Sequence, residues 1–533
     1  MLPYIDYPFF YAANLLGAST DELKLIASFL FSYPLAAVLK RIPDSRPTQK
    51  NLFVIVVSLF YLVGLFDLWT GLRTLLISSV GAYAIAACIS GPFMPWIAFV
   101  FLMGHMSVSH IYRQFANSPH QIDITGAQMV LVMKLSGFCW NIHDGRLPAK
   151  DLSDYQRERA LTKLPGALDF AAYVLFFPSL FVGPAFDFVD YRRWIETSMF
   201  ELPPGADPSL RAPTRKKRKI PRSGTPAAWK AAEGLCCVFA FTKLSGWYTT
   251  ELLLSDQYMS YGLLRRIWIL HVFCFTARLK FCGVWILSEG ACILSGMGYK
   301  GVDPKTGKVM WNRLQNVNLW GVETAQNVRE YLENWNINTN YWLRNYMYLR
   351  VTPRGKKPGF RASLATFVTS AIWHGFYPGY HLTFILASFL QNTAKKFRRH
   401  IRPFFLSPDG KTPTKYKIYY DFCGFLATQA SFSFTTAPFM ILGLKDCLTV
   451  WARVYFYCVI GVAVSMAFFA SPAKQWLTEK LASRNAPKIK SSQSQDDLPT
   501  LGLPNDPGKD LGDAISEVRA EVELRRRKSP QKN

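Results

Sequence analysis

The sequence lacks the patterns that many enzymes use to hold a metal, a nucleotide or an activated nucleophile. Its ten cysteines are scattered, with no C-x-x-C pair and no histidine and cysteine cluster at zinc-binding spacing. Neither a G-x-S-x-G nucleophile elbow nor a G-x-x-x-x-G-K-S/T phosphate loop occurs. We therefore expect no metal site, no permanently bound cofactor and no disulfide framework.

Acidic residues are also scarce. The chain has 36 aspartates and glutamates against 61 lysines and arginines, a formal net charge of +25. In a soluble protein this excess would suggest nucleic acid. In a membrane protein, loop topology and attraction to anionic lipid surfaces explain it. We predict contacts with membrane lipids and none with nucleic acid.

Apolar sequence, by contrast, is abundant. Half of the 533 residues are hydrophobic, and the mean hydropathy is +0.08. A helix needs about 20 apolar residues to cross the hydrocarbon core of a bilayer. The stretches near that length predict an all-α polytopic membrane protein with about eleven membrane segments. These stretches are 23–39, 52–68, 72–89, 92–108, 127–142, 169–189, 232–248, 262–277, 281–296, 362–373 joined to 379–391, 419–443 and 449–471.

Charge and composition divide the chain into parts. We expect an N-terminal segment at 1–20 and a membrane body at 21–472. A basic loop at 205–226, which includes RAPTRKKRKIPRSG, has no hydrophobic period and predicts a mobile cytosolic loop. The polar stretch 473–533 predicts a largely disordered tail.

One histidine stands where an imidazole must be desolvated. In SAIWHGFYPGY, residues 370–380, apolar sequence precedes His374, and Gly375, Pro378 and Gly379 follow it. One interpretation is a neutral core histidine bonded to a carbonyl. The other is a functional histidine at a helix end that faces a cavity, because ionisable residues within apolar segments mark functional sites. The helix-breaking residues favour the second.

The segment VREYLENWNINTNYWLRNYMYLRV, residues 328–351, carries five asparagines. Interpreted as one helix, it aligns four aromatic residues on one face: Tyr331, Trp335, Trp342 and Tyr346. An interfacial aromatic belt explains these rings but not the asparagines, because a buried unpaired amide costs about 1–3 kcal/mol. We interpret the segment as a pocket wall, with Asn336 facing His374. The residues expected to contact a substrate are Trp335, Asn338, Trp342, Tyr346 and Trp373.

These residue types suit acyl transfer onto a hydroxyl. A neutral imidazole takes the proton of an attacking alcohol, which gives His374 the role of general base. An asparagine side chain orients the histidine or donates to the developing oxyanion, which gives Asn336 a catalytic role. Direct transfer needs no activated serine or cysteine.

Several motifs now resemble those of one family. WHGFYPGY (373–380) resembles the histidine motif of the membrane-bound O-acyltransferases, and ENWNINTNYWLRNY (333–346) resembles the asparagine motif of their lysophospholipid acyltransferase branch. Three further stretches match that branch: KLSGFCWNIHDG (134–145), FFPSLFVGPAFDFVDY (176–191) and GVDPKTGKVMWNRLQNVNLWGVE (301–323). Length and tail are most similar to fungal members. The FYxDWWN-type signature of the sterol and diacylglycerol branches is absent.

The resemblance implies a multi-helix body around a transmembrane tunnel in the endoplasmic reticulum membrane. It implies acyl-CoA as co-substrate and a lysophospholipid acceptor, such as lysophosphatidylcholine or lysophosphatidylethanolamine. It places the family's histidine on His374 and its asparagine on Asn336. The basic loop and the tail would be cytosolic.

Other interpretations remain open from sequence. The protein is alternatively a transporter or scramblase-like lipid pathway, a non-catalytic binding protein, or an acyltransferase for another hydroxyl acceptor. Some charged residues are interpreted either as ligands of CoA phosphates or as topology anchors: Arg344, Arg350, Arg354, Lys356 and Lys357. Asp187 and Asp190, at the end of a predicted broken helix, are expected to be solvated loop charges.

Overall fold

The computed structural model describes residues 3–16, 19–116, 123–202, 205, 207–214, 218–352, 359–407, 410 and 412–484. Within these ranges the regular structure is helical, except for an antiparallel hairpin of β1 (Gly301–Val302) and β2 (Val309–Met310) and an isolated bridge between Leu406 and Pro413. The predicted all-α class is confirmed.

The first half of the chain forms ten α-helices, which are α1 (Pro3–Leu16), α2 (Thr20–Arg41), α3 (Pro47–Leu59), α4 (Trp69–Cys88), α5 (Met94–Ala116), α6 (Thr125–Gly145), α7 (Asp154–Arg159), α8 (Ala167–Val174), α9 (Phe188–Ile195) and α10 (Gly224–Ser245). Local signals begin several of them. The Ser19 hydroxyl accepts the N–H of Glu22 at 3.1 Å and caps α2. Pro47 takes the first position of α3, where a missing N–H costs nothing.

The second half contains α11 (Thr250–Leu254), α12 (Asp256–Ser260), α13 (Leu263–Ser295), α14 (Leu319–Glu323), α15 (Val328–Asn334), α16 (Ile337–Leu343), α17 (Phe360–His374), α18 (Pro378–His400), α19 (Lys417–Ile441), α20 (Leu444–Arg453), α21 (Tyr457–Ala470) and α22 (Ala473–Arg484). Two π-helical stretches interrupt regular helix, η1 (Phe60–Leu65) and η6 (Arg344–Tyr348). The 3-10 turns are η2 (Ala149–Asp151), η3 (Phe177–Ser179), η4 (Ser198–Phe200), η5 (Pro208–Leu210) and η7 (Arg402–Phe405).

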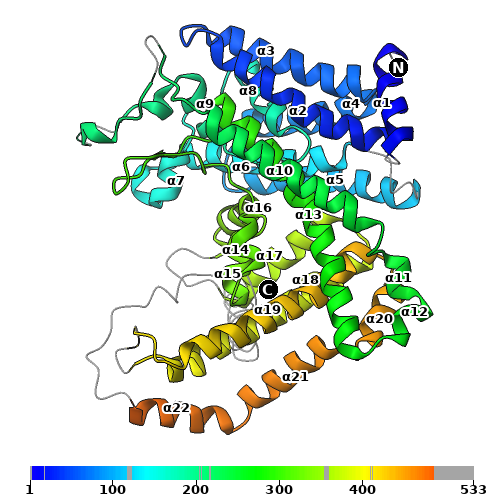
Figure 1. Ribbon diagram of the computed structural model, residues 1–533. Coiled ribbons are helices and arrows are strands. Elements are labelled where there is room, and N and C mark those ends of the chain that lie inside the picture. The colour runs from blue at the N-terminus through cyan, green and yellow to red at the C-terminus, as the bar shows by residue number, and fades with distance from the viewer. Residues whose placement is uncertain are drawn as a thin grey trace, which may run out of the picture.

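The helices pack in two groups (Figure 1). Helices α1–α5 form one side of the molecule, α18–α22 form the other, and α14–α17 lie between them while α10 and α13 cross from one group toward the other. Each group has its own apolar core. The first core is built mainly from α2–α9 and includes Trp342 and Trp373, whereas the second is built mainly from α11–α15 and α18–α21 and includes Tyr331 and Leu386.

Several helices are long and apolar enough to span a membrane. Five pass this test within the described residues, namely α2, α3 with η1, α4, α5 and α13. The pair α20 and α21, bent by 76°, makes a possible sixth. A polytopic membrane protein is therefore confirmed, while the number of about eleven segments stays a prediction. Two predicted segments, 262–277 and 281–296, are one continuous helix of 33 residues.

Two other predictions have distinct outcomes. The stretch 176–191 is a broken helix, as expected, because α8 ends before the 3-10 turn η3 and α-helical structure resumes only in α9. The basic loop is not wholly free of the body. Arg218 donates to the carbonyl of Arg41 at 2.7 Å, and the Lys219 N–H donates to Asp44 at 3.2 Å. Of the tail predicted at 473–533, residues 473–484 instead form α22, and the rest, 485–533, lies outside the described residues.

Candidate active site

His374 is the last residue of α17, and its ring is oriented by its own helix. Its Nδ1 lies 2.7 Å from the carbonyl oxygen of Ser370, one turn earlier. Because a carbonyl oxygen only accepts hydrogen bonds, Nδ1 carries the hydrogen and Nε2 keeps its lone pair. Within the described part of the chain, Nε2 has no hydrogen-bond partner. The ring is therefore bonded to a carbonyl, as a core histidine would be, yet it retains a free basic nitrogen.

Aromatic side chains surround this imidazole. Its centroid lies 4.6 Å from those of Trp373 and Phe384, 5.3 Å from Phe439 and 6.2 Å from Tyr380. These rings come from α17, α18 and α19. They shield the imidazole from bulk water and leave it half-buried.

The end of α17 is also held by a histidine from a distant helix. Nε2 of His110, on α5, donates to the carbonyl of Trp373 at 3.0 Å. Gly375 follows with φ +111°, and a Cβ there would lie 3.0 Å from His110 Nδ1. The Trp373 indole donates to the carbonyl of Met129 on α6 at 3.1 Å. Sequence reasoning missed His110, which lies two residues beyond the predicted apolar stretch 92–108 but within α5.

The asparagine segment is not one helix, and this corrects the prediction of an aromatic stripe on one face. The chain breaks at Asn336, which adopts φ +45°, so α15 ends before it and α16 begins after it. The aromatic residues then diverge. Tyr331 stacks on Phe432 in the second core, whereas Trp342 lies 6.0 Å from Trp373 in the first.

Four of the five asparagines use their side-chain amide nitrogens to hold the backbone around this break. Asn334 donates to the carbonyl of Glu330, and Asn345 donates to that of Tyr341. Asn340 donates to the carbonyls of Leu332 and Trp335, which spans the break itself. These amides are structural.

Asn338 belongs to this group because its amide donates to the loop at 314–316. Asn336 is the exception. Its Oδ1 accepts the Thr339 hydroxyl at 2.9 Å, and no described residue binds its Nδ2. Of the five side-chain amide nitrogens, only this one has no hydrogen-bond partner among the described residues.

Asn336 and His374 both stand where the chain passes from one apolar core to the other. Tyr331 and Trp335 pack in or against the second core, while Trp342 lies in the first. His374 follows Trp373 of the first core and precedes α18 of the second. No hydrogen bond joins the two residues. A series of ring contacts connects their surroundings, running from Phe439 to Phe281 to Trp335.

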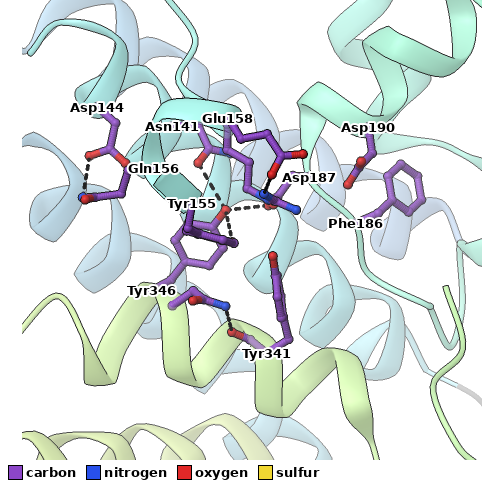
Figure 2. Close-up of polar contacts among 12 residues, drawn as sticks. Asn141, Asp144, Tyr155, Gln156, Glu158, Phe186, Asp187, Asp190, Tyr341 and Tyr346 are labelled. Atoms are coloured by element: carbon purple, nitrogen blue, oxygen red, sulfur yellow. Dashed lines mark hydrogen bonds and ion pairs between the residues drawn. The ribbon is translucent and has the colours of Figure 1, made fainter. Parts of the chain in front are cut away.

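A buried polar cluster holds η6, the π-helical turn that follows Asn336 and α16 (Figure 2). The Tyr346 hydroxyl lies 2.8 Å from Asp187 Oδ1 and 3.1 Å from Asn141 Oδ1, and it accepts from Tyr155 at 3.2 Å. Arg159 donates to Asp187 Oδ2 at 2.9 Å. The pKa of Tyr155 is raised far above its usual range, mainly by burial and to a lesser extent by the nearby Asp187 carboxylate. The phenol therefore stays neutral and can donate a hydrogen bond.

This cluster corrects the expectation that Asp187 and Asp190 are solvated. Asp187 is 8% exposed, and Asp190 pairs with Arg313 at 3.0 Å. Of the basic residues expected to meet CoA or anchor loops, Arg350 instead forms two hydrogen bonds with buried Asp144, at 2.7 and 2.5 Å. Residues 354–357 lie outside the described residues.

Helix α18, which leads away from His374, buries polar atoms that have no partner. Within the described chain these atoms are Thr383 Oγ1, Ser388 Oγ, Thr393 Oγ1 and both polar side-chain atoms of Asn392. An unsatisfied buried polar group costs about 1–3 kcal/mol. Five such hydroxyl and amide atoms lie on this helix, and each has almost no solvent-accessible surface. Its far end carries Arg398, Arg399 and His400.

No group of three or more histidine, cysteine, aspartate or glutamate side chains is placed to hold a metal ion in the described residues. The chemistry that the arrangement supports is that of a neutral imidazole base, a free amide donor and a partly water-shielded aromatic surround.

Comparison with known proteins agrees with this chemistry. Residues 109–436 match the membrane-bound O-acyltransferase family. The chain is 44% identical to a Lysophospholipid acyltransferase of Schizosaccharomyces pombe, over 94% of this chain and 97% of that protein. It is 43% identical to one of Saccharomyces cerevisiae, over 89% of this chain and 78% of that protein. Membrane-bound glycerophospholipid O-acyltransferase 1 of Mus musculus is 29% identical, over 84% of this chain and 89% of that protein.

Proposed function

Because the chain belongs to the membrane-bound O-acyltransferase family, we propose that it transfers an acyl chain from acyl-CoA to the free hydroxyl of a lysophospholipid, with His374 as the general base. The observation that carries the proposal is the hydrogen bond from His374 Nδ1 to Ser370, which leaves Nε2 basic and unpartnered among the described residues. The predicted likeness to fungal members is consistent with the two yeast relatives.

The reaction proceeds in one displacement at the thioester. His374 Nε2 takes the hydroxyl proton as the lysophospholipid oxygen attacks the thioester carbonyl. The new oxygen–carbon bond forms, the carbon–sulfur bond breaks, and the imidazolium returns its proton to the departing CoA sulfur. The products are a diacyl phospholipid and CoA. A partly dry aromatic surround limits competing hydrolysis.

Asn336 acts on the same carbonyl. Its unpartnered Nδ2 donates to the oxyanion that develops during attack, while its Oδ1 is held by Thr339. The alternative, in which Asn336 orients the imidazole directly, is less well supported because no hydrogen bond joins the two side chains. Trp335, Trp342 and Trp373 would line the acyl or lipid path.

Acyl-CoA approaches along α18. The unpartnered hydroxyls and amide of Thr383, Ser388 and Asn392 suit the amides of the pantetheine arm. Basic residues at the far end of α18 suit the CoA phosphates. The thioester would then reach His374 at the near end.

The protein would lie in the endoplasmic reticulum membrane with its most basic connections in the cytosol. Helix α7 and the connection between α18 and α19 lie at one end of the molecule, and α11, α12 and α20 lie at the opposite end (Figure 1). An N-glycosylation acceptor inserted between α18 and α19 should stay unmodified, whereas one inserted between α11 and α12 should be glycosylated. The opposite pattern would reverse the orientation.

The test of activity uses microsomes from cells without other acyltransferases of this class. Labelled oleoyl-CoA and a panel of lysophospholipids are supplied to wild type, His374→Ala and His105→Ala at matched protein levels. Wild type and His105→Ala should form diacyl phospholipid, and His374→Ala should not. Equal activity in all three would remove His374 from the mechanism. Inactivity of wild type on every lysophospholipid would point to another hydroxyl acceptor.

A further inference from the structure

The carbonyl at the end of α17 takes its hydrogen bond from another helix. The last four carbonyls of an α-helix have no partner within that helix. Gly375 N–H satisfies the carbonyl of Ile372 at 3.1 Å, and His110 Nε2 satisfies that of Trp373 at 3.0 Å. The residue held between these two bonds is His374.

The contact is built on both sides. His110 is 6% exposed, and its ring edge packs where a Gly375 side chain would begin. Burying an imidazole is costly unless it is hydrogen-bonded, and the contact with the Trp373 carbonyl meets this requirement. The imidazole supplies a directed hydrogen bond to the residue just before His374.

We propose that His110 is a positioning residue for His374 and acts through the backbone of residues 373–375. This inference rests on the proposed function, because it assumes that His374 is the base. By fixing the end of α17, His110 sets the direction in which the His374 side chain leaves the backbone. A misplacement of about 1 Å at a reacting group can cost about 100-fold in rate.

The test compares two replacements at His110 in the full-length protein in membranes. His110→Leu keeps an apolar side chain of similar bulk but removes the donor, and His110→Gln keeps a donor. His110→Leu should lower kcat by about 10- to 100-fold with little change in KM for either substrate. His110→Gln should recover most of kcat. His110→Met is a second non-donor variant for use where the leucine variant does not accumulate.

His105 supplies the matched control. It lies on the same helix and contacts the Ser78 hydroxyl at 2.9 Å, away from residues 373–375. His105→Leu and His105→Gln should keep wild-type kcat. Thermal unfolding of each purified variant gives its Tm. We expect His110→Leu and His105→Leu to have similar Tm values, although only His110→Leu loses kcat.

Three results would overturn the inference. They are wild-type kcat in His110→Leu, equal loss in His110→Gln and His110→Leu, and a loss of kcat that follows Tm across all variants. His374→Ala separates this failure from failure of the proposed function. If His374→Ala is inactive while His110→Leu is active, only the role of His110 is wrong. If His374→Ala is active, the mechanism itself is wrong.

Discussion

The Tyr346 hydroxyl and the Asp187 carboxylate lie 2.8 Å apart, and this contact joins the π-helical turn η6 to the N-cap residue of α9. η6 directly continues α16, the helix whose N-cap residue is Asn336. The position of the asparagine segment is therefore set partly by a carboxylate that lies 159 residues before Tyr346 in the sequence.

Replacing Asp187 with asparagine should destabilise the protein. The change removes the charge that pairs with Arg159 and leaves this guanidinium only its more exposed partner Glu158, a loss of about 1–3 kcal/mol in the free energy of unfolding. Thermal unfolding of the solubilised protein measures it. Asp154→Asn is the control, because its pair with Arg157 is exposed and should be worth less than about 1 kcal/mol. Equal Tm values would mean that the cluster carries no stability.

Replacing Asn336 with aspartate should separate the function of its side-chain oxygen from that of its amide nitrogen. The variant keeps an oxygen that accepts from Thr339 but loses the amide donor. We expect kcat to fall by about 100-fold or more, as for removal of an oxyanion donor, with Tm little changed. The measurement is steady-state kinetics with oleoyl-CoA and a lysophospholipid.

Asn338→Ala is the comparison for that experiment. Its amide holds the loop at 314–316. This variant should therefore have a lower Tm, while the protein that remains folded should keep the wild-type kcat. An Asn336→Asp enzyme with wild-type kcat would leave the asparagine without a role in oxyanion stabilisation.

Trp285 should influence which acyl chain is used. Its ring lies 5.2 Å from that of Trp335, beside the series of rings between the two candidate residues. Trp285→Ala removes a large ring from this path and should shift the preference toward longer acyl chains. Each additional methylene group that the enlarged path accommodates should change the selectivity, expressed as a free energy, by about 1–3 kcal/mol. Competition between equimolar acyl-CoAs of increasing length measures the shift. Trp268→Ala, which alters an exposed ring on the same helix, should leave the preference unchanged.

The bidentate pair between Arg278 and Glu323 should be essential for stability. Both hydrogen bonds are 2.8 Å long, and the arginine is almost fully buried. Glu323→Gln leaves that charge uncompensated, which should cost about 3–5 kcal/mol. The pair between Arg329 and Glu333 is more exposed, so Glu333→Gln should cost less than about 1 kcal/mol. Similar Tm losses in the two variants would contradict this difference in burial.

Some of the site was predictable because its signals are local. The apolar stretches required a membrane, since burying that much apolar surface in water-soluble form would need a far larger core. His374 was identified because helix-breaking residues follow it within a few positions. Asn336 was identified with the other asparagines, but composition alone did not distinguish it from Asn338.

By itself, the sequence determined the class of protein, the family motifs and the two candidate residues, because run length and short-range motifs are properties of neighbouring positions. Only the tertiary structure decided which nitrogen of His374 is free, which asparagine has an amide nitrogen without a partner among the described residues, that Asp187 is buried and that His110 reaches Trp373. Each of these depends on a hydrogen-bond partner or a backbone angle imposed by packing, often from a segment more than a hundred residues away.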